Sequence, residues 1–317
     1  MKIIIFFLKL LLDAIRDTNK IVKYFKLIEI NGYFVIIRLF IIRFFYGFSW
    51  IRNIKKIKTV ENEKLKLSFS QDTIDLNNIL YKLDSIGYTN IFYLKKNYLS
   101  KILNDILNNK LNINVKKQKN EINLYKRENE NQIQYLERLK NNDISRLTGV
   151  LNVNNNANLK NFVLSKEILK LVSSYINSKT ISINASYFIS LPIKTSKYEK
   201  YENAQYFHWD NDFTKFLKLY IYLTDVDEQS GPHIYVSKTH KQKKINHSLS
   251  RLYSDQDIYN SYKDIKKFCA NEGAFFFTDS YGIHKGEEPK IKPRIMLNIH
   301  YGNNKIKYHQ DDLIINI

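Results

Sequence analysis

Hydrophobic and polar residues alternate along several segments in the second half of the chain. In residues 181–191 the odd positions are Ile, Ala, Tyr or Leu, and the even positions are mostly Ser or Asn. Residues 216–224 repeat the alternation, with Leu and Ile on one side and mainly Lys or Tyr on the other. Side chains point alternately to the two faces of a β-strand, so both segments are predicted to be strands with one apolar face. Three shorter strands are predicted at residues 234–236, 274–278 and 295–301.

Helical periodicity precedes these strands. Apolar residues recur at helical spacing within residues 72–83, for which Asp72 or Thr73 is the predicted N-cap and Gly87 the predicted end. Other predicted elements in this half are helices at residues 97–107 and 165–176 and a short strand at residues 88–94.

The stretch 108–160 has a different composition. It is rich in Asn and Lys, and only residues 133–147 within it show helical periodicity. Long loops or insertions are therefore predicted for most of this stretch.

Many short strands separated by Gly and Pro residues are typical of a mainly β fold with flanking helices. We expect a double-stranded β-helix, that is, a cupin-like jelly roll with a helical N-terminal part. The expected division is an extension at residues 1–60 and one domain at 61–317, with the jelly-roll core at about 180–302. A chain of 317 residues is long enough to bury the core of such a domain.

The first 58 residues are basic and apolar together. They contain 12 Lys or Arg against 3 Asp or Glu, among many Ile, Phe and Leu residues. The most apolar part, residues 33–51, includes Arg38 and Arg43, each of which costs about 2.5–3.5 kcal/mol at the centre of a membrane helix. Two interpretations remain open: helices packed on the domain, or helices lying at a membrane surface.

The charge of the whole chain favours anionic partners. Lys and Arg total 50 against 31 Asp and Glu, a net charge of +19. No arginine-rich tract or Arg-Gly repeat is present, which argues against nucleic-acid binding and leaves a small-molecule substrate as the expected partner, with the charge favouring an anionic one. The single cysteine, Cys269, excludes an intrachain disulfide and is expected to be a small core residue. We expect a cytoplasmic protein, with membrane association through residues 1–58 as the alternative.

One set of polar residues in the strand-rich half has the composition of an iron site. His208 and Asp210 lie two residues apart just before a predicted strand, and His284 and Arg294 follow further along the chain. Two imidazoles and one carboxylate can occupy one face of an Fe(II) ion and leave the other positions open. An arginine adds a forked cation that matches a carboxylate. A surface arginine near Glu287 and Glu288 is the alternative interpretation of Arg294.

Residues 204–301 resemble the phytanoyl-CoA dioxygenase family of Fe(II)- and 2-oxoglutarate-dependent oxygenases. Three blocks carry the resemblance: residues 205–210, residues 219–240 with Ser230-Gly231-Pro232 and a closing His240, and residues 273–284 followed by Arg294. Two positions depart from the family pattern. Residues 236–240 read Val-Ser-Lys-Thr-His where the family usually ends in Pro-Gly-Ser-His, and Met296 stands where a small polar residue is common.

The resemblance implies roles for individual residues. His208, Asp210 and His284 would be the iron ligands, and Arg294 would bind the distal carboxylate of 2-oxoglutarate. Tyr220 would lie beside this cosubstrate. The implied reaction is hydroxylation of a small molecule by O2, with release of succinate and CO2.

Other candidate residues have competing interpretations. Asn184 is a further candidate for cosubstrate binding, or else belongs with Ser186 and Ser190 to a solvated strand face. The lysines near the predicted site form either a basic rim for an anionic substrate or a solvated loop; they are Lys218, Lys238, Lys241, Lys243 and Lys244.

Two functions of other classes remain open. The chain is alternatively a membrane-surface or ligand-binding protein on a jelly-roll scaffold without turnover. It is also possible to place Zn or Mn in the same three ligands, although such a site would not call for Arg294.

Overall fold

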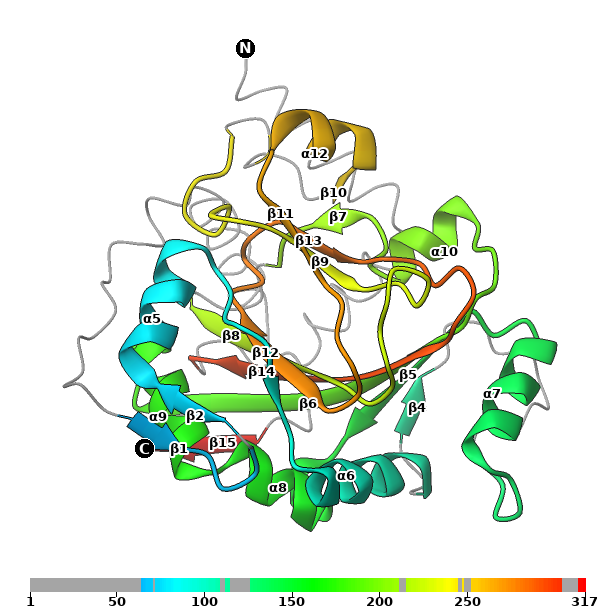
Figure 1. Ribbon diagram of the computed structural model, residues 1–317, viewed down its shortest axis with the longest axis horizontal. Helices are drawn as coiled ribbons and strands as arrows, with labels where there is room; N and C mark the ends of the chain where they lie inside the picture. The colour runs from blue at the N-terminus through cyan, green and yellow to red at the C-terminus, as the bar shows by residue number, and fades with distance from the viewer. Residues whose placement is uncertain are drawn as a thin grey trace, which may run out of the picture.

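The structure, a computed structural model, describes residues 64–70, 72–108, 112–114, 126–210, 215–244, 247, 252–303 and 313–317. Two antiparallel sheets face each other within this part of the chain (Figure 1). The larger sheet has the order β3-β12-β8-β14-β6-β5-β4, and the smaller sheet the order β10-β7-β13-β9-β11.

The bounds of the strands follow from the hydrogen-bonded pairing. The large sheet contains β3 (Phe92–Tyr93), β4 (Asn112–Asn114), β5 (Arg146–Leu151), β6 (Thr180–Ser190), β8 (Phe216–Tyr222), β12 (Ala274–Thr278) and β14 (Arg294–Gly302), with β15 (Leu313–Asn316) paired to β6. The small sheet contains β7 (Phe207–His208), β9 (His233–Val236), β10 (Leu252–Tyr253), β11 (Ile265–Phe268) and β13 (His284–Gly286). Strands β1 (Lys64–Lys66) and β2 (Thr73–Asp75) form a separate pair.

The chain passes repeatedly between the two sheets. Strands β6, β8, β12 and β14 belong to the large sheet, and β7, β9, β11 and β13 to the small one. This alternation confirms the predicted double-stranded β-helix. The predicted domain boundary near residue 60 lies outside the described residues and stays a prediction.

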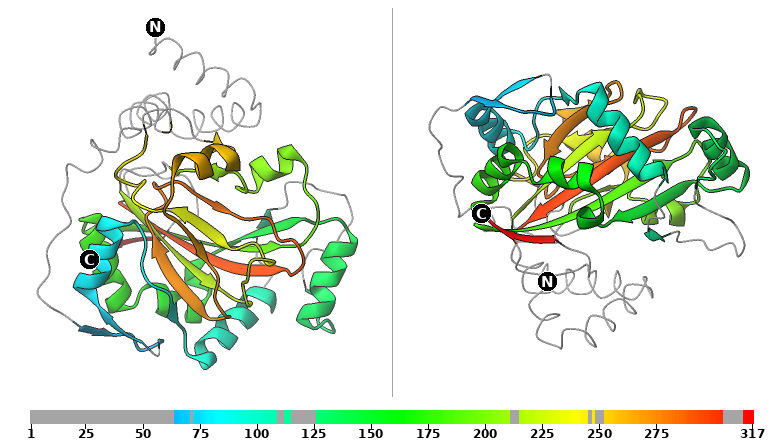
Figure 2. Two further views of the ribbon diagram at one scale, coloured as in Figure 1. Left: turned by 45° about the horizontal axis from the view of Figure 1, so that its top comes forward. Right: turned by 90° about the horizontal axis from the view of Figure 1, so that it is seen from below.

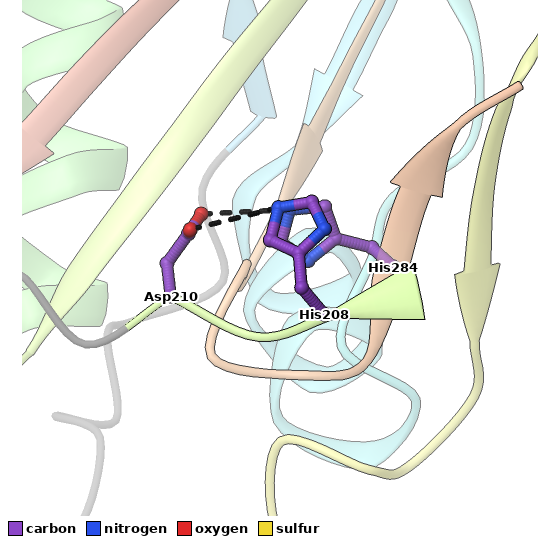
Figure 3. Close-up of side chains that lie close together, drawn as sticks. All are labelled: His208, Asp210 and His284. Carbon is purple, nitrogen blue, oxygen red and sulfur yellow. Dashed lines mark ion pairs between the residues drawn. The ribbon is translucent and has the colours of Figure 1, made fainter. Parts of the chain in front are cut away.

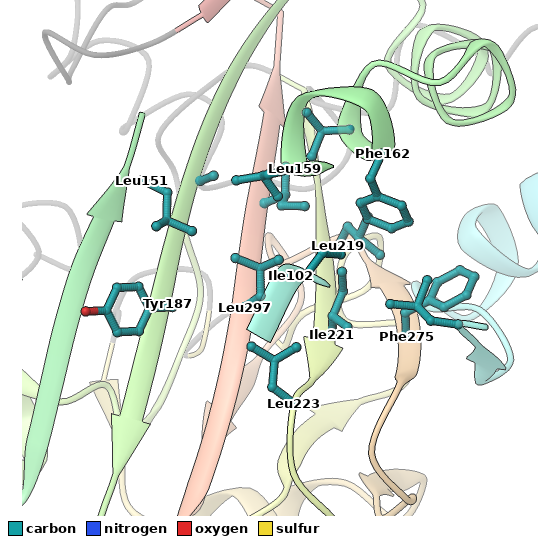
Figure 4. Close-up of a cluster of buried hydrophobic side chains, with 14 of the residues drawn as sticks. Ile102, Leu151, Leu159, Phe162, Tyr187, Leu219, Ile221, Leu223, Phe275 and Leu297 are labelled. Atoms are coloured by element: carbon teal, nitrogen blue, oxygen red, sulfur yellow. The ribbon is translucent and has the colours of Figure 1, made fainter. Parts of the chain in front are cut away.

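Helices cover the outer face of the large sheet (Figures 1 and 2). They are α5 (Leu76–Ser85), α6 (Lys96–Asn108), α8 (Ala157–Val163) and α9 (Lys166–Ile176). Their apolar faces pack on the odd-numbered side chains of the strands, such as Leu219, Ile221 and Leu297 (Figure 4). The even-numbered side chains of β6, β8 and β14 are left on the other face, toward the small sheet.

Four further helical segments lie at the edges: α7 (Gln132–Asn141), the 3₁₀ turn Val153–Asn155, α10 (Lys197–Glu202) and α12 (Asp255–Ser261). Helix α12 packs over the small sheet through Ile258, which joins a second apolar cluster with Phe207 and Ile234. A third apolar cluster, which includes Tyr222, Phe276 and Met296, is separate from these two.

The first helix begins later than the sequence suggested. Its N-cap is Asp75, whose carboxylate accepts hydrogen bonds from the backbone N–H groups of Asn77 and Asn78. Residues 73–75 instead form β2, so the prediction of Asp72 or Thr73 as the cap was wrong. Gly87 follows the helix end with φ of 92°, a left-handed conformation that glycine adopts without strain.

The Asn-rich stretch contains more regular structure than expected. Helix α7 ends at Asn141, and the chain then forms β5 where the sequence suggested continued helix. The 3₁₀ turn and α8 follow before residue 164. The local pattern failed here because β5 is defined by its pairing with β6, a contact made through the tertiary fold. Cys269 was also mispredicted, since it is exposed at the end of β11.

The described part of the chain contains no helix that is both long and apolar enough to cross a membrane. The basic segment at residues 1–58 lies outside the described residues, so its two interpretations stay predictions.

Candidate metal centre

Three side chains converge between the two sheets (Figure 3). His208 ends β7, Asp210 follows two residues later, and His284 begins β13. Strands β7 and β13 are antiparallel neighbours, and His208 and His284 are direct partners in the register, so their rings lie side by side with centroids 4.3 Å apart. One ligand atom from each of the three residues lies within 4.8 Å of the others.

The orientation of both imidazoles is set by the backbone. Nδ1 of His208 lies 2.9 Å from the carbonyl oxygen of Tyr206, and Nδ1 of His284 lies 2.9 Å from that of Gly282. A carbonyl only accepts, so each Nδ1 carries the proton and each Nε2 carries the lone pair. The two Nε2 atoms face Asp210, at 3.8 Å from Oδ1 for His208 and 3.4 Å from Oδ2 for His284. This tautomer is the one a metal ligand requires.

The charge states also suit metal binding. Burial, and then the neighbouring His208, lower the pKa of His284 to about 3, so its imidazole is neutral at physiological pH. Burial alone would raise the pKa of the Asp210 carboxyl. The Lys218 ammonium and the imidazoles of His284 and His208 outweigh burial and hold that pKa below its usual value. The centre therefore presents a neutral His284 imidazole, the imidazole of His208 and one carboxylate, the donor set of a 2-His-1-carboxylate site.

Lys218 contributes a cation to the same centre. It lies on the inner face of β8, and its Nζ is 2.7 Å from Oδ2 of Asp210. A metal ion bound to Asp210 would share that carboxylate with the ammonium group.

The loop before His284 forms a backbone hydrogen bond with Asp210 and is itself held by buried tyrosines. The backbone N–H of Asp210 donates to the carbonyl oxygen of Ser280 at 2.9 Å. The preceding residue, Asp279, is fully buried and accepts hydrogen bonds from the hydroxyl of Tyr175 at its carboxylate and from the hydroxyl of Tyr235 at its carbonyl. The Tyr235 hydroxyl fits between two glycines, because a Cβ atom would lie 2.2 Å from it at Gly87 and 2.0 Å at Gly282.

Arg294 is buried on the inner face of the large sheet. Only 2% of its surface is exposed, and neither its Nε nor its Nη1 has a hydrogen-bond partner among the described residues. Its guanidinium packs against Gly286 of β13, the strand that begins with His284. A Cβ atom added at Gly286 would lie 3.2 Å from Nη2 of Arg294. The alternative of a surface arginine is therefore wrong. A buried cation with unused donors fits a carboxylate ligand.

The structure places Tyr220 and Asn184 differently. Tyr220 is buried on the inner face, with its ring 4.5 Å from that of His233 and its hydroxyl 3.5 Å from Oγ of Ser280, the residue that supports Asp210. Asn184 pairs with His300, six positions along β6 from Ser190, the partner of Arg294. Tyr220 thus lies near both the metal ligands and Arg294, whereas Asn184 lies at the far end of the inner face from Arg294. Both roles in cosubstrate binding stay predictions.

The five lysines named above do not form a shared rim. Lys218 points inward to Asp210, and Lys241 forms an ion pair with Asp84. Lys243 is buried, with its Nζ 3.3 Å from the centre of the Tyr281 ring. Lys238 and Lys244 are exposed.

Sequence reasoning missed three residues of the inner face. Arg146 lies in β5, which the pattern did not predict, and Ser190 was assigned to a possible solvated face although it is 1% exposed. His233 is buried beside His284, with ring centroids 5.5 Å apart, and its Nε2 has no partner in the described structure. Burial lowers the pKa of His233 well below its usual value. The short alternation of residues 146–151 was the only available signal for Arg146.

No protein-family model and no curated protein sequence matches this chain. Solved structures of similar arrangement include HygX from Streptomyces hygroscopicus with nickel and 2-oxoglutarate bound, at 10% identity and a TM-score of 0.49, covering 73% of this chain and 89% of that one. The epimerase SnoN in complex with Fe3+, α-ketoglutarate and nogalamycin RO is 11% identical at a TM-score of 0.47, over 72% of this chain and 83% of that one. AviO1 from Streptomyces viridochromogenes Tue57 is 12% identical at a TM-score of 0.45, over 75% and 99%. At these identities and scores, the functional assignment rests on the residues of the site.

Proposed function

We propose that this protein is an Fe(II)- and 2-oxoglutarate-dependent oxygenase acting on a small molecule. One observation carries the proposal: a His-His-carboxylate centre lies in the same barrel interior as Arg294, a buried arginine with unused donors. The centre provides three ligands for one face of the ion, and Arg294 provides the forked partner that a dicarboxylate cosubstrate needs at its far end. The resemblance of residues 204–301 to the phytanoyl-CoA dioxygenase family supports the same assignment.

The residues fit both groups. His208, Asp210 and His284 would hold Fe(II), and Arg294 would hold the distal carboxylate of 2-oxoglutarate. When bound, iron, cosubstrate and O2 supply the oxidising chemistry, with succinate and CO2 as by-products, and hydroxylation is the outcome we propose. Zn or Mn in the same ligands would leave the buried donors of Arg294 without a role.

The chain's own contribution is orientation and shielding. The tautomers of His208 and His284 are fixed by backbone carbonyls, so both lone pairs are aimed before any ion binds. Around the centre, Tyr222, Phe276 and Met296 form an apolar interior that limits access of water. Such a setting strengthens the interaction of Arg294 with an anion, because few water molecules compete for its donors.

The test is an anaerobic titration of the metal-free protein with Fe(II) and then 2-oxoglutarate, followed through the weak visible charge-transfer band of the chelate. We expect the band in the wild type at one equivalent of each. In Arg294→Gln the affinity for 2-oxoglutarate should fall about 30-fold or more, because the loss of a buried charge pair costs about 2–5 kcal/mol.

Two controls separate the steps. Fe(II) should still bind to Arg294→Gln, since no metal ligand has changed. Fe(II) binding without a band in the wild type would indicate a metal site of another kind, and no binding at all would overturn the proposal and favour a scaffold without turnover.

A further inference from the structure

We propose that Arg146 binds an anionic group of the substrate, a carboxylate or a phosphate, while Arg294 binds the cosubstrate. The inference rests on the proposed function and adds a substrate class to it.

Arg146 and Arg294 lie in one row across the large sheet. Ser190 of β6 is the register partner of Arg146 on one side and of Arg294 on the other. Directly opposed residues of antiparallel strands project from the same face, so all three side chains point into the space between the sheets. The Ser190 hydroxyl between the two arginines has no hydrogen-bond partner among the described residues.

The two arginines differ in depth. Arg294 is 2% exposed, whereas Arg146 is only partly buried and lies on the inner face of β5, where Thr148 and Val150 are also partly exposed. The Arg146 guanidinium stacks over the Phe188 ring, 4.2 Å from its centre, and Nη1 donates to the carbonyl oxygen of Asn203. Its Nε is buried and unpaired within the described structure. Arg146 is therefore the more exposed of the two arginines, and Arg294 lies further inside.

Neither arginine forms an ion pair with a carboxylate in the described structure, and only Arg294 has one nearby, that of Glu287. Burial and then the charge of Arg294 lower the pKa of Arg146, and burial lowers that of Arg294, so each cation is held at a cost. With both groups bound, one carboxylate of the cosubstrate would offset the charge of the divalent ion together with Asp210, which Lys218 shares, and the other carboxylate would pair with Arg294. Arg146 would still have no carboxylate partner, and an anionic group on the substrate would supply one.

A purely structural function is the competing interpretation. Arg146 holds Asn203, which precedes the segment that carries His208 and Asp210, and this contact alone would explain its position. The two interpretations differ in one respect: a structural arginine has no affinity for anions.

The experiment measures anion binding to the Fe(II)·2-oxoglutarate form under anaerobic conditions. Acetate and methyl phosphate are titrated separately by calorimetry at constant ionic strength, and 2-oxoglutarate affinity is measured in the same variants. We expect one equivalent of at least one anion to bind to the wild type, and the stronger of the two indicates whether the substrate group is a carboxylate or a phosphate. In Arg146→Gln this affinity should fall about tenfold or more, with 2-oxoglutarate affinity changed less than threefold, because hydrogen bonds between charged groups are the strong class.

Two further variants control the measurement. Lys101→Gln removes an exposed positive charge from α6, on the opposite side of the large sheet, and should leave anion binding unchanged. Arg146→Lys keeps the charge without the fork and should give an intermediate affinity. It also carries the test if the melting temperature shows that Arg146→Gln does not fold.

Several outcomes would overturn the inference. Anion binding that is absent in the wild type, or equal in Arg146→Gln, would leave Arg146 a structural residue. A loss of 2-oxoglutarate affinity as large as that in Arg294→Gln would assign Arg146 to the cosubstrate. If Arg294→Gln retained wild-type affinity for 2-oxoglutarate, the proposed function itself would fail, and this result is independent of Arg146.

Discussion

The two parts of the site satisfy their polar groups in opposite ways. At the metal centre the protein supplies partners for its own groups: backbone carbonyls hold both Nδ1 atoms, and Lys218 pairs with Asp210. In the arginine row, Nε of Arg146, Nε and Nη1 of Arg294 and the hydroxyl of Ser190 have no partner in the described structure. Buried polar groups are nearly always paired, so the second region is incomplete without ligands.

The side chains of the candidate metal centre are already oriented by the protein, whereas Arg146 and Arg294 lack partners for some of their donors. The proposed metal ligands hold their geometry without an ion, which would lower the entropic cost of binding one. The arginine row holds unpaired N–H donors on two cations, so it should favour anionic ligands over neutral ones. Substitutions at the first region should therefore act on metal affinity, and substitutions at the second on anion affinity.

The largest effect is expected from removal of a metal ligand. Asp210→Ala should lower Fe(II) affinity by more than about 100-fold, because even changes outside the ligands commonly cost about 10–100-fold. His208→Ala should do the same, and 2-oxoglutarate turnover should disappear in both. Metal content after anaerobic loading and calorimetric titration measure the effect. Glu272→Ala, which removes an exposed carboxylate elsewhere, is the control, and full metal binding in Asp210→Ala would rule out the proposed centre.

The next largest effect is expected on the stability of the loop that forms a hydrogen bond with Asp210, through the fit of the Tyr235 hydroxyl against Gly87. Gly87→Ala places a Cβ 2.2 Å from the buried Tyr235 hydroxyl, in a backbone with φ of 92°. We expect a loss of about 2–4 kcal/mol in the free energy of unfolding, from left-handed strain together with overpacking. Gly273→Ala is matched in backbone, with φ of 81°, but its Cβ would meet nothing closer than 3.3 Å. Chemical denaturation of both variants separates sterics from strain, and equal losses would contradict the tight fit at Tyr235.

The jelly roll and the convergence of His208, Asp210 and His284 could be predicted from the sequence for the same physical reason. A period of two along β6 and β8 is a local property, and so is the two-residue spacing of His208 and Asp210. Strand β13 then brings His284 beside His208, which the predicted fold allowed but the sequence did not prove. These parts were predictable because each depends on few residues or on a strong repeat.

The arginine row was not predictable in the same way. Arg146 lies in a strand within an Asn-rich region, and only its register with Ser190 places it in the interior. Ser190 itself belongs to a polar strand face whose composition is compatible with exposure to solvent, and it is buried because the small sheet covers that face. Register and sheet packing are tertiary properties, so composition and periodicity could not reveal which polar residues end up unpaired.

A smaller effect concerns the cation at the metal centre. Lys218→Met removes the ammonium group that pairs with Asp210, so an incoming ion no longer shares the carboxylate. We expect Fe(II) affinity to rise about 3–10-fold, the effect of roughly 1 kcal/mol from a partly buried ion pair. Lys101→Gln on α6 controls for overall charge. A fall in affinity would show instead that Lys218 is needed to keep Asp210 ionised and in place.

The smallest effect is expected in the turn after β9. Lys238 has φ of 66°, a left-handed conformation that costs a non-glycine residue about 1–2 kcal/mol, at the position where the resembled family has the glycine of Pro-Gly-Ser-His. Lys238→Gly removes this strain but raises the entropy of the unfolded chain, so we expect a net gain of about 0.5 kcal/mol in the free energy of unfolding. Lys266→Gly, an exposed lysine within β11, should change stability by a similar amount in the opposite direction, because glycine weakens a strand interior. Denaturant midpoints measure both. Destabilisation by both substitutions would show that the Lys238 side chain contributes more to stability than its backbone strain costs. Metal affinity should stay unchanged in either variant, because neither residue is a proposed ligand.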